Sequence, residues 1–335
     1  MSITRGQITD AMTNAPSYPS LPAAQATSVP GSPARYNEQL FEPKPAPNFL
    51  IVGAARAGTT SLWHWLRQHP QVFMARHKEP GFFLHKFRAF SHDKYLSLFK
   101  AGRGKQCIGE ASTAYLSAPE SPQWIYDVLG KVKIIIVLRN PVERAYSMYS
   151  LMVMHGFEPI ETFEEALNQE NRRMASLPFR QNCPLDLLNY QYFHAGLYID
   201  KVSAYINIFG ADQVKVLLFD DLKKNPDGFC TEVCDFLGIS RAKHQALTQE
   251  NSGVIPRSIS LQYRLRSMRV RTRRLFGVSD RLVTSWLILA MIINKARGAK
   301  KSMPPAVRAQ LVERYRPSVK QLSGLIDRDL SHWLK

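Results

Sequence analysis

Residues 48–83 decide the fold and read NFLIVGAARAGTTSLWHWLRQHPQVFMARHKEPGFF. The run 49–52 is apolar and too short for an independent helix, which is typical of a buried strand. A turn of small residues follows from Gly53 to Gly58. Beyond it, apolar side chains recur at helical spacing until Pro70 ends the pattern. The order of strand, glycine-flanked loop and helix predicts a P-loop-like α/β fold with three layers, in which helices flank a central parallel sheet.

The loop has the composition of an anion site. Backbone N–H groups in a tight loop and at a helix start can surround a phosphate group, and small residues let the phosphate approach. The residues that would do this combine a cation, two small residues and three hydroxyl groups: Arg56, Ala57, Gly58, Thr59, Thr60 and Ser61. Glycines are also common in ordinary strand-to-helix turns, so the preceding strand and the hydroxyl cluster carry the phosphate interpretation.

The chain departs from the pattern of nucleoside triphosphatases. In those enzymes a lysine follows the second loop glycine, and an aspartate that ends another strand helps to hold Mg²⁺. Here Thr59 takes the place of the lysine, and the apolar strand 133–138 is followed by Arg139. We therefore predict an anionic nucleotide that is held by protein cations, with no metal ion. A P-loop kinase or nucleoside triphosphatase is the alternative enzyme class.

Four motifs in this order resemble the sulfotransferases that use 3′-phosphoadenosine 5′-phosphosulfate (PAPS). Residues 53–60 are similar to the 5′-phosphosulfate loop of that family, and residues 139–149 (RNPVERAYSMY) to its 3′-phosphate motif. Residues 78–83 (KEPGFF) resemble the KExxFF segment of the heparan sulfate branch, and residues 110–116 match that branch loosely. The resemblance extends over nearly all of residues 48–335.

The resemblance implies a role for each motif. PAPS would be the sulfuryl donor, residues 56–61 would bind its 5′-phosphosulfate, and Arg139 and Ser147 would bind its 3′-phosphate. Glu79 matches the general base that removes the acceptor proton, and Arg56 would stabilise charge on the leaving group. The family usually has lysine in the place of Arg56, and an arginine can act there only as a fixed charge.

Alternatives stay open for several of these side chains. From composition alone, Glu79 could be a solvated surface carboxylate, and His77 and His85 are rival bases. Glu110 could contact the acceptor or have a structural role, and the same holds for its neighbour Ser112. The heparan branch often carries a lysine directly after the glutamate that matches Glu110, whereas this chain has alanine there.

Length and composition indicate one catalytic domain. The 335 residues carry a formal net charge of +17, and 45% of them are hydrophobic, enough for a sizeable core. We expect residues 1–47 to form a disordered leader without a signal peptide, and residues 48–335 to form the sulfotransferase domain. Within that domain, residues 255–303 form a basic and apolar helical insertion. Its apolar run 282–293 is too short to span a bilayer and is expected to pack on the core, with a membrane-surface element as the alternative.

The positive charge limits the possible partners. It fits a polyanionic donor, an acidic acceptor or peripheral contact with an anionic membrane. The expected acceptor is a glycan, a glycolipid or a small alcohol, and the carbohydrate classes rest on the resemblance. A basic module without catalysis is the non-enzymatic alternative, but nucleic acid is not an expected partner because no recognition motif is apparent. The expected location is the cytoplasm, including the inner face of the membrane.

Overall fold

The computed structural model describes residues 45–84, 91–183, 185–241, 254–276, 281–296, 299–300 and 302–335. Nearly all of the expected leader, together with His85, lies outside the described residues. The described chain forms one compact unit that begins at Lys44 and ends at Lys335.

A five-stranded sheet forms the centre of this unit, and all of its neighbouring strands are parallel. The strand order is β2-β3-β1-β4-β5. The strands are β1 (Phe49–Gly53), β2 (Val72–Met74), β3 (Cys107–Ala111), β4 (Lys133–Leu138) and β5 (Val214–Leu218). Because they are parallel, all their carboxyl ends meet at one edge of the sheet, where ligands bind in open α/β folds.

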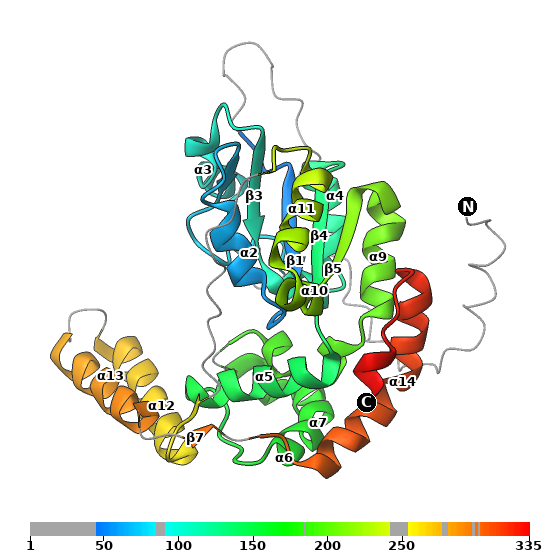
Figure 1. Ribbon diagram of the computed structural model, residues 1–335. Helices are drawn as coiled ribbons and strands as arrows, with labels where there is room; N and C mark the ends of the chain where they lie inside the picture. The colour runs from blue at the N-terminus through cyan, green and yellow to red at the C-terminus, as the bar shows by residue number, and fades with distance from the viewer. Residues whose placement is uncertain are drawn as a thin grey trace. The chain divides into compact units, whose positions relative to one another are not determined.

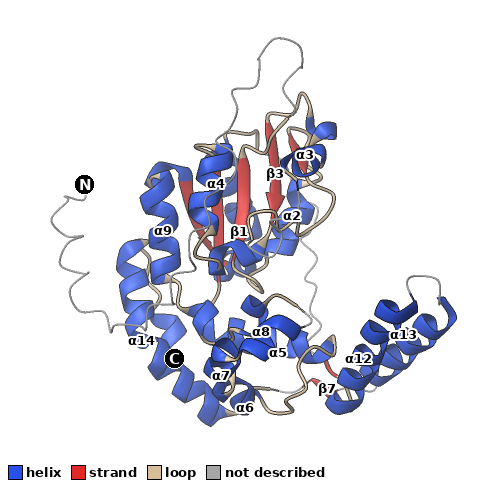
Figure 2. Ribbon diagram, turned by 180° about the vertical axis from the view of Figure 1, so that it is seen from behind, coloured by secondary structure: helices blue, strands red, loops and turns tan. Residues whose placement is uncertain are grey.

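Helices cover both faces of the sheet. On one face lie α2 (Thr59–Leu66) and α11 (Pro226–Leu237), whose following turns are joined by a 2.9 Å hydrogen bond between His69 Nε2 and the Ser240 carbonyl (Figure 1). On the other face α4 (Ser121–Leu129) packs against α9 (Ile199–Phe209) (Figure 2). The arrangement confirms the predicted three-layer α/β fold with a parallel sheet at its centre.

The two central strands explain why the sequence folds this way. Every side chain of β1 is buried, and so is every side chain of β4 from Ile134 to Leu138. Strands that are covered on both faces need continuous apolar runs rather than alternating ones. The runs FLIV and IIIVL therefore specify the middle of the sheet, and the polar loop residues that follow them are left at its edge.

A helical layer follows β4. Helix α5 (Pro141–Met154) begins directly after that strand and leads into three short helices. A buried ion pair anchors these helices, because the two terminal nitrogens of Arg173, Nη1 and Nη2, donate to the Glu158 carboxylate at 2.6 and 2.7 Å. The remaining short helices and the long closing helix are α3 (His92–Ser97), α6 (Phe163–Asn168), α7 (Glu170–Ala175), α8 (Leu177–Asn182), α10 (Phe219–Lys224) and α14 (Pro305–Leu325).

The basic and apolar segment forms a helical hairpin. Helix α12 (Ile259–Phe276) packs against α13 (Arg281–Ala296), and the short strands β6 (Val254–Ile255) and β7 (Ala299–Lys300) pair at the base of the hairpin. In both views the hairpin lies beside α5 and away from the five-stranded sheet (Figures 1 and 2). Across the described part of the chain, no helix is both long and apolar enough to cross a membrane.

The hairpin corrects one expectation. Within the apolar run, the described side chains of residues 285–293 do not join the main core: the buried ones, Leu287 and Met291, lie on the face of α13 that packs against α12, and other apolar side chains of α13 are exposed. The physical reason is that α12 supplies the covering layer for one face of α13, and no described element covers the opposite face.

Candidate active site

The loop after β1 has a backbone conformation that suits anion binding. Arg56 and Gly58 have positive φ angles of 71° and 85°, and Gly58 is the residue that precedes α2. A β-carbon added at Gly58 would lie 2.8 Å from Phe219 and 2.9 Å from Leu222, so only glycine fits there. The loop therefore turns tightly into the first turn of α2, where N–H groups lack intrahelical partners.

Three residues that lie far apart in the sequence meet beside this loop. The Arg56 Nε donates a 3.0 Å hydrogen bond to the Ser147 hydroxyl, and Arg139 Nη1 donates to the Arg56 carbonyl at 3.1 Å. Arg139 follows β4 directly, and Ser147 lies about two turns into α5. The order of the parallel strands produces this meeting, because β1 and β4 are neighbours and their loops emerge side by side.

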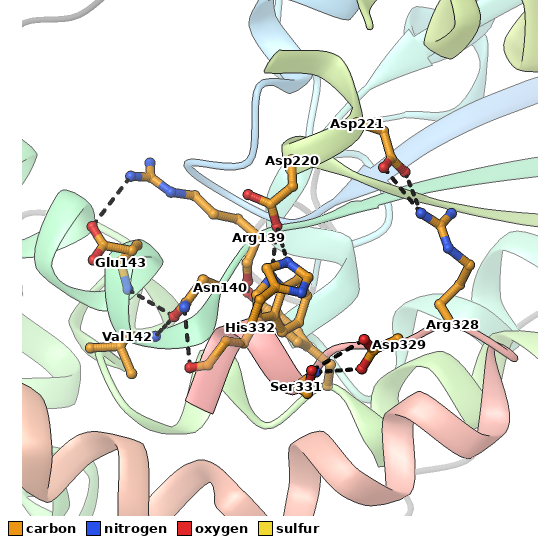
Figure 3. Close-up of polar contacts among 12 residues, drawn as sticks. Arg139, Asn140, Val142, Glu143, Asp220, Asp221, Arg328, Asp329, Ser331 and His332 are labelled. Atoms are coloured by element: carbon orange, nitrogen blue, oxygen red, sulfur yellow. Dashed lines mark hydrogen bonds and ion pairs between the residues drawn. The ribbon is translucent and has the colours of Figure 1, made fainter. Parts of the chain in front are cut away.

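Arg139 lies in a partly buried position. Its guanidinium lies 5.1 Å from the centre of the Phe219 ring and forms a 3.9 Å ion pair with Glu143, toward which it points in Figure 3. Burial lowers the pKa of Arg139, nearby carboxylates of Glu143 and Asp220 oppose the shift, and Arg144 adds to it. Burial thus disfavours the charged form of the Arg139 fork, and a bound anion would stabilise that charge.

Glu79 is held in a defined orientation. Its Oε2 accepts from the Thr113 backbone N–H at 3.0 Å, and its Oε1 accepts from the Thr113 hydroxyl at 2.8 Å. Lys78 Nζ lies 3.2 Å from Glu79 Oε1 and 3.5 Å from the Thr59 hydroxyl, which joins the carboxylate to the loop. The Glu79 side chain keeps 36% of its surface exposed, so a substrate could reach it.

A single cavity of about 500 Å³ connects these groups. Its volume lies within the range of small-molecule sites, which is about 300–1,000 Å³. The lining includes most of the residues that the sequence predicted for the site: Arg56, Gly58, Thr59, Thr60, Ser61, Glu79 and Arg139. Ala57 is fully buried, so only its backbone could meet a ligand. Ser147 is not a lining residue, but its hydroxyl accepts a hydrogen bond from the lining residue Arg56.

Comparison with known proteins then gives the family. A model of the sulfotransferase domain matches residues 46–253, well over half of the chain. The chain belongs to the sulfotransferase family. A crystal structure of a sulfotransferase from Alicyclobacillus acidocaldarius matches 87% of the chain and 100% of its own length, with 30% identity and a TM-score of 0.66.

Curated relatives match a smaller part of the chain and only part of their own length. Heparan sulfate glucosamine 3-O-sulfotransferase 3B1 of Homo sapiens is 28% identical over 66% of this chain and 54% of its own length. Membrane-associated sulfotransferase kil1 of Dictyostelium discoideum is 21% identical over 61% of this chain and 59% of its own length. The sulfotransferase chain thus spans about half the length of the curated relatives it matches.

Two residues with open roles prove to be structural. Glu110 is fully buried and accepts hydrogen bonds from the hydroxyl groups of Tyr95, Tyr115 and Ser112 at 2.6–2.9 Å. Burial raises the pKa of the Glu110 carboxyl to about 7, although these hydrogen bonds oppose the shift. The Ser112 hydroxyl also accepts from the Gly81 N–H at 3.0 Å. The network therefore connects the end of β3 to the segment that carries Glu79.

Two further cations, Lys78 and Arg144, line the cavity. The sequence analysis assigned no role to Lys78, although its position beside Glu79 was a signal that could have indicated one. Arg144 Nη2 donates to the Tyr192 carbonyl at 2.5 Å and to the Gln191 carbonyl at 3.4 Å. Its Nε is buried without a hydrogen-bond partner.

Other candidates do not join the site. His77 is exposed and is not part of the cavity lining among the described residues. Arg257 lies at the base of the hairpin, where its backbone N–H donates to the Asn294 carbonyl, and it is not part of the cavity lining. The described residues contain no group of three or more His, Cys, Asp or Glu side chains that could hold a metal ion.

Proposed function

We propose that this chain transfers a sulfuryl group from PAPS to a hydroxyl or amine group of an acceptor that carries a carbohydrate. One observation carries the proposal: a single cavity contains an anion-binding loop, the Arg139 guanidinium and a carboxylate that is oriented by Thr113. The loop and the arginine fit the two ends of a bisphosphorylated adenosine. The carboxylate fits the acceptor, which must lose a proton.

The chemistry of the cavity lining supports PAPS as the donor. Residues 56–61 would surround the 5′-phosphosulfate with backbone N–H groups and hydroxyl groups. Arg139 and Ser147 would bind the 3′-phosphate, and the planar fork of an arginine suits paired phosphate oxygens. The contact between Arg56 and Ser147 connects these two subsites, so binding at one supports the geometry of the other.

The transfer step needs a base and a stabilised leaving group. Glu79 takes the proton of the acceptor hydroxyl, and the acceptor oxygen forms a bond to sulfur. The bond between sulfur and the bridging phosphate oxygen breaks, and 3′-phosphoadenosine 5′-phosphate leaves. Arg56 supplies fixed positive charge for the oxygen that becomes more negative, and we add Lys78 to this role because it contacts both Thr59 and Glu79.

The curated relatives and the lining of the cavity both bear on the acceptor. Several curated relatives are named for heparan sulfate, which supports a carbohydrate acceptor. Beyond the loop, the cavity lining combines an apolar group, Leu84, Met148, Leu151, Leu185 and Leu188, with the polar residues Ser117, Asp186 and Asn189. Such a mixed lining suits an acceptor that carries both hydroxyl groups and a hydrocarbon portion, so a glycolipid is one form of the proposed acceptor.

The test uses PAPS labelled with ³⁵S and an extract that contains glycans and glycolipids. The wild-type protein should form a labelled product. Glu79→Gln should lower its rate by about 10²–10⁴ and leave the affinity for 3′-phosphoadenosine 5′-phosphate within about twofold, because the amide keeps the shape but cannot take the proton. Glu164→Gln, a change at an exposed carboxylate of α6, is the matched control. If Glu79→Gln formed product as fast as Glu164→Gln, Glu79 could not be the base.

The same assay separates the alternative enzyme class. Because Arg139 follows β4 where a metal-holding carboxylate would be expected, labelled product should still form in the presence of a chelator. Mg²⁺-dependent turnover of ATP, without any sulfated product, would favour a kinase or nucleoside triphosphatase and would contradict the proposal.

A further inference from the structure

We propose that the α12–α13 hairpin is a docking surface for an anionic lipid bilayer. The hairpin would lie in the headgroup region, with the exposed apolar stripe of α13 in contact with acyl chains. The cations of α12 would pair with lipid phosphates. This proposal concerns binding alone and does not depend on the proposed sulfuryl transfer.

Helix α13 has two opposite faces of similar chemistry and different exposure. Leu287, Met291 and Asn294 follow helical spacing and are buried, and this face packs against α12. The opposite stripe is exposed and consists of Trp286 at 70%, Leu289 at 46%, Ile292 at 54% and Ile293 at 47%. Large apolar side chains that form such a stripe indicate an interaction surface, because water contact with them is unfavourable.

The charge of the hairpin supplies the second observation. Between residues 255 and 303 the sequence has twelve basic residues and a single acidic one, Asp280. Arg264 and Arg271 are exposed on α12 and are seven residues apart, so they lie on one face of the helix. Leu261 and Met268 share this face and are exposed as well. Cations beside exposed apolar side chains are typical of helices that lie in a membrane interface.

Other binding partners would match either the apolar stripe or the positive charge of the hairpin, but not both. A second copy of this chain could cover the apolar stripe, but it would bring two strongly basic hairpins together, and like charges repel. A nucleic acid or an acidic polysaccharide could bind the cations, but it would leave Ile292, Ile293 and Leu289 in water. Only an anionic bilayer offers an acidic surface directly above an apolar layer, and Trp286 suits the boundary between them.

The hairpin is anchored firmly enough to act as a platform. The side-chain amide of Asn294 on α13 donates to the Ser258 carbonyl and to Gln262 Oε1, both at 2.8 Å. Gln262 on α12 in turn donates to the Met154 carbonyl at 3.0 Å, at the end of α5. Helix α5 also contributes Met148 and Leu151 to the cavity wall. One helix thus connects the proposed membrane surface to the apolar wall of the site.

The experiment uses the full chain and lipid vesicles, with neither donor nor acceptor present. Flotation is measured with vesicles of phosphatidylcholine alone and with vesicles that contain phosphatidylglycerol. The wild-type protein should float with the anionic vesicles and dissociate at high salt. Arg264→Glu with Arg271→Glu should weaken this binding by roughly tenfold or more, since each cation near the surface contributes to the affinity. Lys100→Glu with Lys320→Glu, at exposed lysines outside the hairpin, should retain wild-type binding.

A second pair of variants tests the apolar stripe. Trp286→Ser with Ile293→Ser should weaken vesicle binding by roughly tenfold or more, because less apolar surface enters the bilayer. Leu177→Ser, at an exposed leucine of α8, should bind as the wild-type protein does. Sedimentation of the same proteins without lipid measures self-association. Equal binding by stripe variants and wild type would overturn the proposal, and so would a wild-type dimer that Trp286→Ser with Ile293→Ser dissociates.

Discussion

At the scale of single residues, the cavity of the site brings several cations together. Arg56, Arg139 and Arg144 all line it, and Glu143 pairs with Arg139. Cations held close together repel each other and gain when an anion enters, so this arrangement would contribute to the affinity for the proposed bisphosphorylated nucleotide.

The first prediction concerns Arg139. Arg139→Ala should weaken binding of 3′-phosphoadenosine 5′-phosphate by about tenfold to a hundredfold, because a charge-assisted hydrogen bond to phosphate is lost. It should change binding of adenosine 5′-phosphate, which lacks the 3′-phosphate, much less. Calorimetry with both nucleotides measures the two affinities. Arg103→Ala, at an exposed arginine, is the control. Equal weakening for both nucleotides would contradict a role at the 3′-phosphate.

The second prediction concerns Lys78. Lys78→Met should lower kcat by about 10²–10³, the usual effect of losing one group that stabilises transition-state charge, with a smaller change in donor affinity. Lys78→Arg should recover part of the rate, because the charge remains but the geometry differs. Steady-state kinetics of sulfated product gives both values. Lys94→Met changes an exposed lysine outside the cavity and should have wild-type kinetics. Wild-type kcat in Lys78→Met would exclude Lys78 from the step.

At the scale of elements, the loop between β1 and α2 depends on its contact with α10. Gly58 takes φ of 85° where the ring of Phe219 and the end of Leu222 come close. Phe219 also lies below the Arg139 guanidinium. The start of α10 therefore fixes the loop on one side and Arg139 on the other.

The third prediction compares two glycines. Gly58→Ala should destabilise the protein by roughly 1–3 kcal/mol, since it adds both a disfavoured φ and a steric overlap. It should also weaken donor binding. Gly324→Ala in α14 is the matched control: an added β-carbon there meets nothing within 4 Å, and alanine should stabilise the helix by roughly 0.5–1 kcal/mol. Urea unfolding measures both changes. If Gly58→Ala left the free energy of unfolding unchanged, the loop could accommodate a β-carbon, and glycine would not be required at this position.

At the scale of the whole molecule, the C-terminal segment closes the edge of the sheet next to the site. Trp333 is almost fully buried, and its indole N–H donates to Asp220 at 2.6 Å. The Asn140 side chain donates to the Trp333 carbonyl and accepts from the Val142 N–H at the start of α5 (Figure 3). Arg328 pairs with Asp221 through two hydrogen bonds of 2.8 and 3.0 Å. The C-terminal segment thus holds Asn140, the residue that follows Arg139, in place.

The fourth prediction tests this closure. Trp333→Ala should cost about 3–5 kcal/mol of stability, the usual loss for a large buried aromatic side chain. It should also weaken binding of 3′-phosphoadenosine 5′-phosphate, because Asn140 and then Arg139 lose support. Trp333→Phe keeps most of the volume and loses the indole N–H, so it should cost less. Thermal unfolding and calorimetry below the unfolding temperature separate the two effects. Unchanged nucleotide affinity in folded Trp333→Ala would limit the segment to a role in stability.

Local sequence patterns determined the central strands of the sheet and the residues of the loop between β1 and α2. A buried parallel strand needs an unbroken apolar run, and a phosphate loop needs small and hydroxyl-bearing residues directly after it, so residues 49–61 and 133–139 carry their roles in their own order. The tertiary structure decided what no local pattern contains: the contact of Arg56 with Ser147, the position of Lys78 between Thr59 and Glu79, and the exposed face of α13. These features depend on which strands are neighbours and on which surfaces remain uncovered, and both are properties of packing between segments distant in the chain.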